Sequence, residues 1–540
     1  MKKFLKSVVC VLFVCLVALP AAACDPAKPR DKTLTVTVSN LGFGTAWLDS
    51  VAQEFEKLYE VDVKIEPTVI AKDLLLQLEN DYKLTDICLF AGVDQAWDTM
   101  RKGKFMQIDD VWATAPEGED LTVSEKMIAE YRSAYKFNDH YWSMPFITEL
   151  GGIAYNATTL NGLFGEGKWR LPKTTFELDA LCEDIKNAGA YAFSWCNKEN
   201  ACYWGLPCSV WKAQYDGKMN TIKAHEARVY KPSDASADED GYVLDMTGEL
   251  LDMKGELRML ETVQKYVYSQ NGYSHKYCTS MQFAEAQAAF AGIPYANDNK
   301  RVAFSPNGSW LYEENFEDFE YKKQDVGFMR VPIISALSEK LSYYADGDTD
   351  FNTLPYDKQA RYDAALTAIV DYIEGGKTGN KPTEADGLSI SDADIARVDE
   401  AYNIAYIKDQ SHMFIPFNSQ NPELAKKFML FLCSDYAGEI YTTVTHGFFP
   451  TYVKINDNNA AYMHRFDRDV AAILNTSTQI ITPDSRFNFG LKSVTPEEFF
   501  SSGQSYYGTP KESYENCYVK LNRDNWGDKL RIAGFNALAG

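Results

Sequence analysis

Residues 33–91 carry the pattern that most constrains the fold, because strand-like and helix-like periodicities alternate along them. Residues 33–39 and 61–67 alternate apolar and polar side chains, as half-buried strands do. Residues 48–58 place apolar side chains at a spacing of three to four, which predicts an amphipathic helix. A second helical pattern at 74–78 leads to the short apolar run TDICLFAG, a buried strand. This order predicts an α/β domain with a parallel sheet.

The loops that follow the first and third predicted strands are candidate ligand-binding segments. In open α/β sheets, ligands bind beyond the carboxyl ends of the strands. We therefore expect residues 40–47 and 91–97 to approach a ligand.

Length and charge exclude some classes of protein. A chain of 540 residues is long enough for two sizeable lobes, and its net charge is −22. Without a basic stripe, the chain lacks the positive footprint of a protein that reads nucleic acid. The 33 Tyr, 30 Phe and 10 Trp suit carbohydrate binding, although aromatic residues also fill large cores.

The N-terminus has the features of an export signal. Basic residues precede an apolar run and the small residues ALPAAAC, a pattern typical of a secretory signal peptide over residues 1–23. The end of this run resembles the bacterial lipobox, in which the cysteine is lipidated, here Cys24. Cleavage after Ala23 without lipidation is the alternative, since Ala21 stands where Leu is usual. Residues 24–32 then form a short polar tether.

No motif predicts a catalytic or metal site. The six histidines lack ligand spacing, and the patterns HExxH, GxSxG and GxGxxG are absent. The acidic run DGDTD at 346–350 has carboxylates at a calcium-like spacing, but Phe351 stands where a calcium loop has glycine. Cys196, Cys202 and Cys208 are compatible with a disulfide or with free thiols. We expect neither a cofactor nor a metal.

The middle of the chain continues the α/β pattern. Gly151 to Tyr155 is strand-like, and the segment LPKTTFELDALCEDIKNAG is a helix with Thr174 as its cap, Glu177 three residues on and Gly189 at its end. A short helix, FAEAQAAFAG, precedes the strand and turn RVAFSPNGSW. DVGFMRVPII is a further strand.

Residues 335–410 are interpreted as an insertion. Two helical patterns, DAALTAIVDYIEGG and DADIARVDEAYNIAYIKD, are separated by a loop rich in Gly, Lys, Asn and Pro at 375–383. A strand and a helix follow, and Asn421 and Pro422 mark the start of that helix.

Several segments in a consistent order resemble one family. The segments YWSMP, GGIAYN, PKTTFEL, AQAAFAG, NGSWL, NPELAKKFMLFL and GFFPT are similar to those of the extracellular solute-binding proteins of ABC importers, in the maltose-binding-like carbohydrate branch. The similarity extends over nearly the whole mature chain. It implies an α/β fold of two lobes, joined by hinge crossings of the chain, with a ligand cleft between them.

The resemblance also implies how the chain is divided between the lobes. Lobe I would comprise residues 33–145 and 331–447, including the helical insertion at about 335–410. Lobe II would comprise residues 146–330 and 448–540.

Ligand-binding residues are implied by position. Trp310, on the turn NGSW, corresponds to a family tryptophan that stacks on a sugar, and a flat ring on a polar turn can cover the C–H face of a pyranose. Glu149 and Asp94 correspond to carboxylates that bind hydroxyls, although Glu149 could serve only the hinge and the offset of Asp94 differs by one residue. Phe43 and Trp47 lie in the first loop, where Trp47 could equally be a core residue.

Three further aromatic residues follow the helix that ends at Gly189. The resemblance implies that this loop supplies additional stacking rings, here Trp195, Tyr203 and Trp204, and we expect at least one of the three to lie in the core.

The sequence thus predicts a lipid-anchored receptor on the extracytoplasmic face of the cell membrane. It would bind a sugar, specifically an oligosaccharide, and deliver it to the permease subunits of an ABC transporter. We expect it to be a monomer and not to be an enzyme. Two alternatives remain, namely a secreted carbohydrate-active enzyme and a binding protein for another solute such as a peptide or a polyamine.

Overall fold

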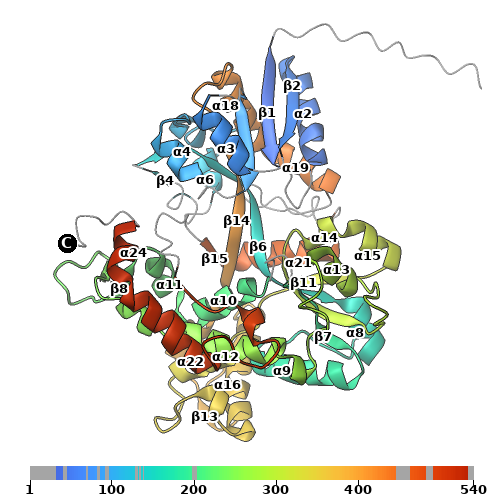
Figure 1. Ribbon diagram of the computed structural model, residues 1–540, viewed down its shortest axis with the longest axis vertical. Coiled ribbons are helices and arrows are strands. Elements are labelled where there is room, and N and C mark those ends of the chain that lie inside the picture. The colour runs from blue at the N-terminus through green and yellow to red at the C-terminus, as the bar shows by residue number, and fades with distance from the viewer. Residues whose placement is uncertain are drawn as a thin grey trace, which may run out of the picture.

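The structure of the protein is a computed structural model (Figure 1). It describes residues 32–39, 45–68, 71–81, 85–91, 96–127, 132, 136–137, 139–197, 203–445, 463–481 and 491–532.

The first five elements form the predicted parallel unit. Strand β1 (Thr33–Ser39) pairs in parallel with β2 (Asp62–Thr68) on one side and with β3 (Ile87–Ala91) on the other. Helices α2 (Ala46–Tyr59) and α3 (Ala71–Glu79) connect the strands, and α2 buries Leu48, Val51 and Phe55. The prediction of a parallel α/β unit is therefore confirmed.

The upper half of the molecule in Figure 1 contains this unit and the elements packed around it. Its other helices and strands are α4 (Trp97–Arg101), α5 (Asp109–Trp112), α6 (Val123–Lys126), β4 (Lys136–Phe137), β5 (His140–Tyr141), α18 (Pro422–Leu432) and α19 (Asp435–Thr445).

Two long antiparallel strands, β6 (Met144–Asn156) and β14 (Ile404–Phe414), run from the upper half into the lower half (Figure 1). The upper end of β14 pairs with β3, and its lower end pairs with β15 (Thr478–Ile481). These two strands make one continuous nine-stranded sheet out of both halves.

The lower half builds its own sheet on β6. Strands β10 (Val302–Gly308) and β11 (Val326–Met329) both pair antiparallel with the second part of β6, and β7 (Tyr191–Phe193) pairs in parallel with β10. Two short hairpins lie outside this sheet, β8 (Arg228–Tyr230) with β9 (Tyr242–Leu244), and β12 (Glu384–Ala385) with β13 (Leu388–Ser389).

The lower half of the molecule contains many helices. They are α8 (Ala157–Phe164), α9 (Thr175–Asn187), α10 (Gly205–Asp216), α11 (Lys218–His225), α12 (Gly255–Val267), α13 (Phe283–Phe290), α14 (Leu311–Glu314), α15 (Phe316–Lys322), α16 (Tyr356–Glu374), α17 (Asp392–Tyr402), α21 (Arg465–Thr476), α22 (Pro510–Ser513), a π-helix (Tyr514–Leu521), α23 (Asn522–Asp524) and α24 (Trp526–Ile532).

Short 3₁₀ helices complete the elements. They are η2 (Glu249–Asp252), η3 (Ser269–Asn271), η4 (Ser335–Lys340), η5 (Phe351–Thr353) and η6 (Pro496–Phe499).

Two large hydrophobic clusters form the interior. The first fills the upper half and continues along the lower sheet, where it includes Phe328 of β11 and Phe466 of α21. The second includes Leu178 of α9, Trp211 of α10 and Leu260 of α12.

The predicted cap of α9 is confirmed. Thr174 precedes the helix with extended backbone angles, and its hydroxyl accepts a hydrogen bond from the backbone N–H of Glu177 at 3.2 Å. This bond satisfies one of the N–H groups that the first turn of a helix leaves without a partner.

The segment predicted as an insertion of lobe I packs with the lower half instead. Leu337, Leu366 and Val398 belong to the second cluster, together with residues of α9 and α10. Residues of the chain join the first cluster again only from Ala405 onward. A helical pattern fixes which face is apolar but not which core that face meets, so the sequence could not place this segment.

The second helical pattern in that segment extends too far in the prediction. Helix α17 ends at Tyr402, and β14 begins at Ile404, whereas we expected the helix to continue to residue 409. Ile404 to Ile407 pair with β15, and Tyr406 and Ile407 also pair with β6, so this pairing overrides the local helical periodicity.

Candidate functional site

The candidate site lies where β6 and β14, paired side by side, cross from the upper half of the molecule into the lower half. We call these two the crossing strands. Glu149 lies on β6, is 8% exposed and stands opposite Lys408 in the register. The next pair along the strands is Thr148 with Gln410, so β14 carries one extra residue at this point. Such a bulge bends a strand and changes the direction of nearby side chains. Glu149 therefore sits where the sheet bends between the two halves.

Trp310 is held next to the same stretch of β6. The N–H of Ser309 donates to the carbonyl oxygen of Leu150 at 2.9 Å, and the N–H of Leu150 donates to the hydroxyl of Ser309 at 3.1 Å. These two bonds fix the turn after β10 against the residue that follows Glu149.

The indole ring of Trp310 folds back over Gly308. A Cβ atom built on Gly308 would lie 2.0 Å from Cζ3 of Trp310, so a side chain larger than hydrogen does not fit here. The tryptophan is 5% exposed in this conformation. Stacking on a ligand therefore requires that the atoms covering the ring move aside.

Tyr203 is in contact with Trp310. The ring centroids of Tyr203 and Trp310 lie 5.4 Å apart at 74°, an edge-to-face contact. Burial raises the pKa of Tyr203, and the nearby carboxylates of Glu314 and Glu149 raise it further. The structure thus brings three of the predicted site residues together.

Trp47 approaches this group from the upper half through Tyr441. Trp47 is 1% exposed, stacks on Phe146 with centroids 4.9 Å apart, and meets the Tyr441 ring edge-on at 5.2 Å. Burial raises the pKa of Tyr441 well above its usual value, with further contributions from Glu313 and Glu149 among the carboxyl groups nearby. Trp47 lies in the first turn of α2 as a core residue, which is the alternative that the sequence left open.

Two further carboxyl groups, Glu313 of α14 and Asp467 of α21, lie at this junction. Burial raises the pKa of Glu313 to about 7. Burial also raises the pKa of Asp467 well above its usual value, and the nearby Glu313 adds to this shift. A negative charge on either Glu313 or Asp467 disfavours ionisation of the other, so the pair favours a state in which one of the two carboxyl groups is protonated.

The sequence signals for these additional residues were weak. Glu313 lies only three residues after Trp310, and this short distance could have drawn attention to it. Asp467 and Tyr441 carry no recognisable motif, because the fold alone brings α21 and α19 to the crossing strands.

Trp195 and Trp204 lie in the second core, away from this group. Trp195 is 3% exposed, and its indole N–H donates to the hydroxyl of Ser274 at 2.7 Å. Trp204 is fully buried and stacks on Tyr266 with centroids 5.9 Å apart at 8°. The expectation that at least one of the three aromatic residues in this loop lies in the core is confirmed.

Three predicted positions fall outside the described residues. They are Phe43 and Asp94 in the two loops at strand ends, and the lipidation candidate Cys24. Their roles stay predictions.

The acidic run at 346–350 makes contacts within the protein. Asp348 accepts hydrogen bonds from Lys358 at 2.7 Å and from the Tyr362 hydroxyl at 2.8 Å, while Asp350 is ion-paired with Arg258 at 2.8 Å. Within the described ranges, no group of three or more His, Cys, Asp or Glu side chains could hold a metal ion.

The seven described cysteines are all buried, and no disulfide joins any two of them. Cys196 and Cys208 therefore form no disulfide with each other, and Cys202 lies outside the described residues. In the part of the chain that the structure describes, no helix has both the length and the apolar composition needed to cross a bilayer.

The arrangement has a definite chemical character. The rings of Tyr203 and Trp310 are in contact, and Glu149 lies near enough to the hydroxyls of Tyr203 and Tyr441 to raise their pKa values. Aromatic faces cover apolar C–H surfaces, and carboxylates accept hydrogen bonds from donors such as hydroxyl groups. The group therefore suits a ligand that combines both kinds of surface.

Comparison with solved structures identifies the fold. The SBP RafE in complex with raffinose is similar to this chain with a TM-score of 0.51 and 14% identity, over 94% of this chain and 100% of that chain. The GacH receptor of Streptomyces glaucescens, solved unliganded and with acarbose, has a TM-score of 0.55 and 13% identity, over 93% and 98% of the two chains. The fold is that of two-lobe solute-binding proteins.

A third similar structure comes from work on xylan utilization by the thermophilic bacterium Caldanaerobius polysaccharolyticus. Its TM-score is 0.56 with 13% identity, over 91% of this chain and 100% of that chain. No family model matches the chain, and no curated protein matches it. The upper and lower halves correspond to the two lobes of this fold, joined by β6 and β14.

Proposed function

We propose that this protein is an extracytoplasmic receptor that binds a carbohydrate, specifically an oligosaccharide, and delivers it to the permease of an ABC transporter. The observation that carries the proposal is that Trp310 contacts Tyr203, and that the turn carrying Trp310 is hydrogen-bonded to Leu150, the residue after Glu149 on β6. In a two-lobe fold, a ligand at this point can contact both lobes and stabilise their closure.

The chemistry of the group supports a sugar as the ligand. A pyranose presents an apolar C–H face, which the Trp310 indole can cover once the atoms that now bury it have moved aside. It also presents hydroxyl groups, which can donate hydrogen bonds to Glu149. The solved structures of similar fold include receptors bound to raffinose and to acarbose, as well as a receptor described as preferring galactopyranose. These ligands supply the first probes for this chain.

The same proposal includes the position of the receptor in the cell. The lipobox-like sequence before Cys24 would provide a lipid anchor, and the polar residues after it a tether. The receptor would then act as a monomer at the outer face of the membrane, next to its permease.

A thermal-shift panel tests the function directly. The panel contains raffinose, galactose, acarbose and xylan-derived oligosaccharides, with peptides and polyamines as the other class of solute. A ligand present at a hundred times its Kd stabilises the folded protein by about 2.7 kcal/mol, which raises the melting temperature measurably. Stabilisation by a peptide or polyamine, with none by any sugar, would overturn the assignment of a carbohydrate.

Variants at the proposed site connect the binding to these residues. Glu149→Gln should weaken sugar binding in calorimetry, because an amide replaces only part of the hydrogen bonding of a carboxylate. A matched change at an exposed carboxylate, Glu317→Gln on α15, should leave the affinity unchanged. Prolonged incubation with each bound sugar, followed by product analysis, tests the enzyme alternative, since a receptor returns its ligand intact.

A further inference from the structure

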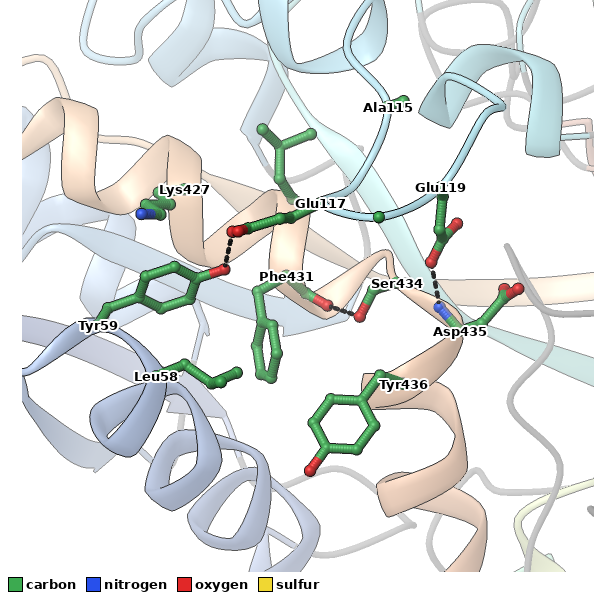
Figure 2. A pocket seen from close by; sticks show the side chains of 12 residues that line it. Leu58, Tyr59, Ala115, Glu117, Glu119, Lys427, Phe431, Ser434, Asp435 and Tyr436 are labelled. Carbon is green, nitrogen blue, oxygen red and sulfur yellow. Dashed lines mark hydrogen bonds between the residues drawn. The ribbon is translucent and has the colours of Figure 1, made fainter.

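A second cavity lies on the outer surface of the upper lobe, away from the crossing strands. Its volume is about 780 Å³, within the range of small-molecule sites. The C-terminal end of α2, the loop between α5 and α6, the end of α18 and the start of α19 line it, as Figure 2 shows. All of these elements belong to one lobe, so the cavity does not depend on how the two lobes are closed. We call it the α2–α19 pocket.

Aromatic and aliphatic side chains form the apolar wall of the α2–α19 pocket. Phe431 lies between two tyrosines, with its ring centroid 6.3 Å from that of Tyr59 and 6.2 Å from that of Tyr436 (Figure 2). Leu58 is 56% exposed and Tyr436 is 47% exposed, an unusual exposure for large apolar groups that border a hollow. A ligand with an apolar face would remove this surface from water.

Polar groups stand at the rim of the same pocket. The Tyr59 hydroxyl donates to Glu117 at 2.7 Å, and the backbone N–H of Asp435 donates to Glu119 at 2.6 Å (Figure 2). These bonds fix the loop between α5 and α6 against the two helices. Three carboxylates, those of Glu117, Glu119 and Asp435, therefore border an apolar hollow and can accept hydrogen bonds from a ligand.

The charges at the rim narrow the class of ligand. Glu119 and Asp435 are ion-paired with Lys126. An anionic ligand would therefore approach three carboxylates against the two ammonium groups of Lys126 and Lys427, an excess of negative charge that disfavours it. A cationic ligand would compete with Lys427, whose ammonium already lies 3.7 Å from the centroid of the Tyr59 ring. A neutral ligand rich in hydroxyl groups avoids both conflicts, because it donates to the carboxylates and carries no charge.

We propose that the α2–α19 pocket is a second carbohydrate site, which binds a neutral saccharide with a C–H face against Tyr436 and Phe431 and with hydroxyl groups donating to Glu117 and Asp435. It lies outside the group around Glu149, and the proposal does not depend on the function assigned to that group. Such a site would let the receptor hold a saccharide on its surface in addition to the one between its lobes.

The methyl groups of Leu58 report on this pocket directly. Protein labelled with ¹³C at its leucine methyl groups is titrated with raffinose and with galactose, and Leu58→Ile identifies the Leu58 signals by their disappearance. We expect a saturable shift of these signals on addition of the sugar. Choline and inorganic phosphate, added separately, should not reproduce it.

Variants at Tyr436 test the contact itself. Tyr436→Ala should weaken the binding seen at Leu58 by about tenfold, the equivalent of about 1.4 kcal/mol. Tyr436→Phe keeps the ring and should retain the binding. Tyr321→Ala removes another exposed tyrosine, 79% exposed on α15 in the other lobe, and should have no effect.

Several results would overturn the proposal. They are the absence of any Leu58 shift with neutral saccharides, a shift that Tyr436→Ala leaves unchanged, and a shift with choline or phosphate in place of sugar. Calorimetry with Glu149→Gln reports on the central site independently, so failure of either site can be recognised without the other.

Discussion

At the scale of single residues, Trp310 is buried in the structure, whereas stacking on a ligand remains its proposed role. Its place on the turn NGSW favoured a ring exposed to ligand, and in the structure the ring lies against Gly308 and Tyr203 with 5% exposure. Truncation of a ring exposed on such a turn would leave the fold almost unaffected. Because the ring is buried, Trp310→Ala should instead lower the free energy of unfolding by about 3–5 kcal/mol.

A better test of stacking compares two apolar replacements. Trp310→Phe keeps a flat ring, whereas Trp310→Leu keeps apolar bulk without one, so both retain part of the packing. We expect the leucine variant to bind the cognate sugar about 30-fold more weakly than the parent, equivalent to about 2 kcal/mol, and the phenylalanine variant to lose much less. Calorimetry gives the affinities, and melting curves show whether the two variants are equally stable.

The stacking role would be contradicted by equal affinities. If the phenylalanine and leucine variants bind alike while both melt below the parent, the ring contributes to packing alone.

Gly308→Ala tests the position of the ring without removing it. The added Cβ would lie 2.0 Å from Cζ3 of Trp310, so the indole must move. We expect weaker sugar binding and a lower melting temperature. Gly347→Ala, at a glycine with open space around its Cα, serves as the matched control and should change neither. An unchanged affinity in Gly308→Ala would mean that the ring position seen here is not required for binding.

At the scale of elements, α14 and α21 bring two carboxyl groups together, those of Glu313 and Asp467, near Tyr441 of α19. The pKa of Glu313 is raised from 4.5 to about 7, so the folded state binds this proton more tightly than the unfolded chain does. The stability contributed by protonated Glu313 is therefore fully present at pH values below its ordinary pKa, and it is lost as the pH rises through about 7.

Glu313→Gln should consequently stabilise the protein only at higher pH. Glutamine cannot ionise, so the variant avoids the penalty that burial imposes on the charged form. We expect a gain of about 1–3 kcal/mol at about pH 8 and little change at about pH 4, measured by denaturant unfolding. Glu317→Gln, at an exposed position on α15, should show no such dependence. A gain of equal size at both values of pH would exclude ionisation as its cause.

Individual elements were more predictable from the sequence than their partners. The alternation at 33–39 and the cap at Thr174 are local signals, and β1 and α9 appear where those signals indicated. The packing of residues 335–402 and the strand beginning at Ile404 depend on contacts with distant segments. A periodic pattern gives the face of an element but not the surface it meets.

The same limit applies to the candidate site. Glu149, Tyr203 and Trp310 were proposed from their places in separate motifs, and the fold brings them together. Trp204 comes from the same aromatic loop as Tyr203, yet it points into the core and stacks on Tyr266. Composition cannot tell which of several aromatic residues in one loop belongs to the core and which to the ligand site. The helix that follows the loop sets the direction of each side chain.

At the scale of the whole molecule, the predicted lipidation of Cys24 would determine whether the protein stays at the membrane. If Cys24 is lipidated, the mature protein begins with this residue and carries a diacylglyceryl group. Mass spectrometry of the purified protein should detect this adduct, and Cys24→Ser should release the protein into the aqueous phase. An unmodified Cys24 at the mature N-terminus would contradict the prediction and indicate a secreted receptor.

The crossing strands predict how the two lobes respond to a ligand. Only β6 and β14 are paired across the middle of the sheet in the described part of the chain, with a bulge next to Lys408 on β14 and two glycines, Gly151 and Gly152, at the corresponding part of β6. A bulge and glycines allow bending that regular strand residues resist. The lobes should therefore rotate about this region as nearly rigid bodies.

Small-angle X-ray scattering can measure this movement. Addition of a sugar identified in the thermal-shift panel should reduce the radius of gyration of the parent protein, because a ligand that contacts both lobes favours the closed arrangement. Trp310→Leu, at the same sugar concentration, should remain at the larger value, because its weaker binding leaves the site mostly empty. A saturating sugar that leaves the radius of gyration of the parent unchanged would mean that binding occurs without closure, and that β6 and β14 serve as a rigid connection.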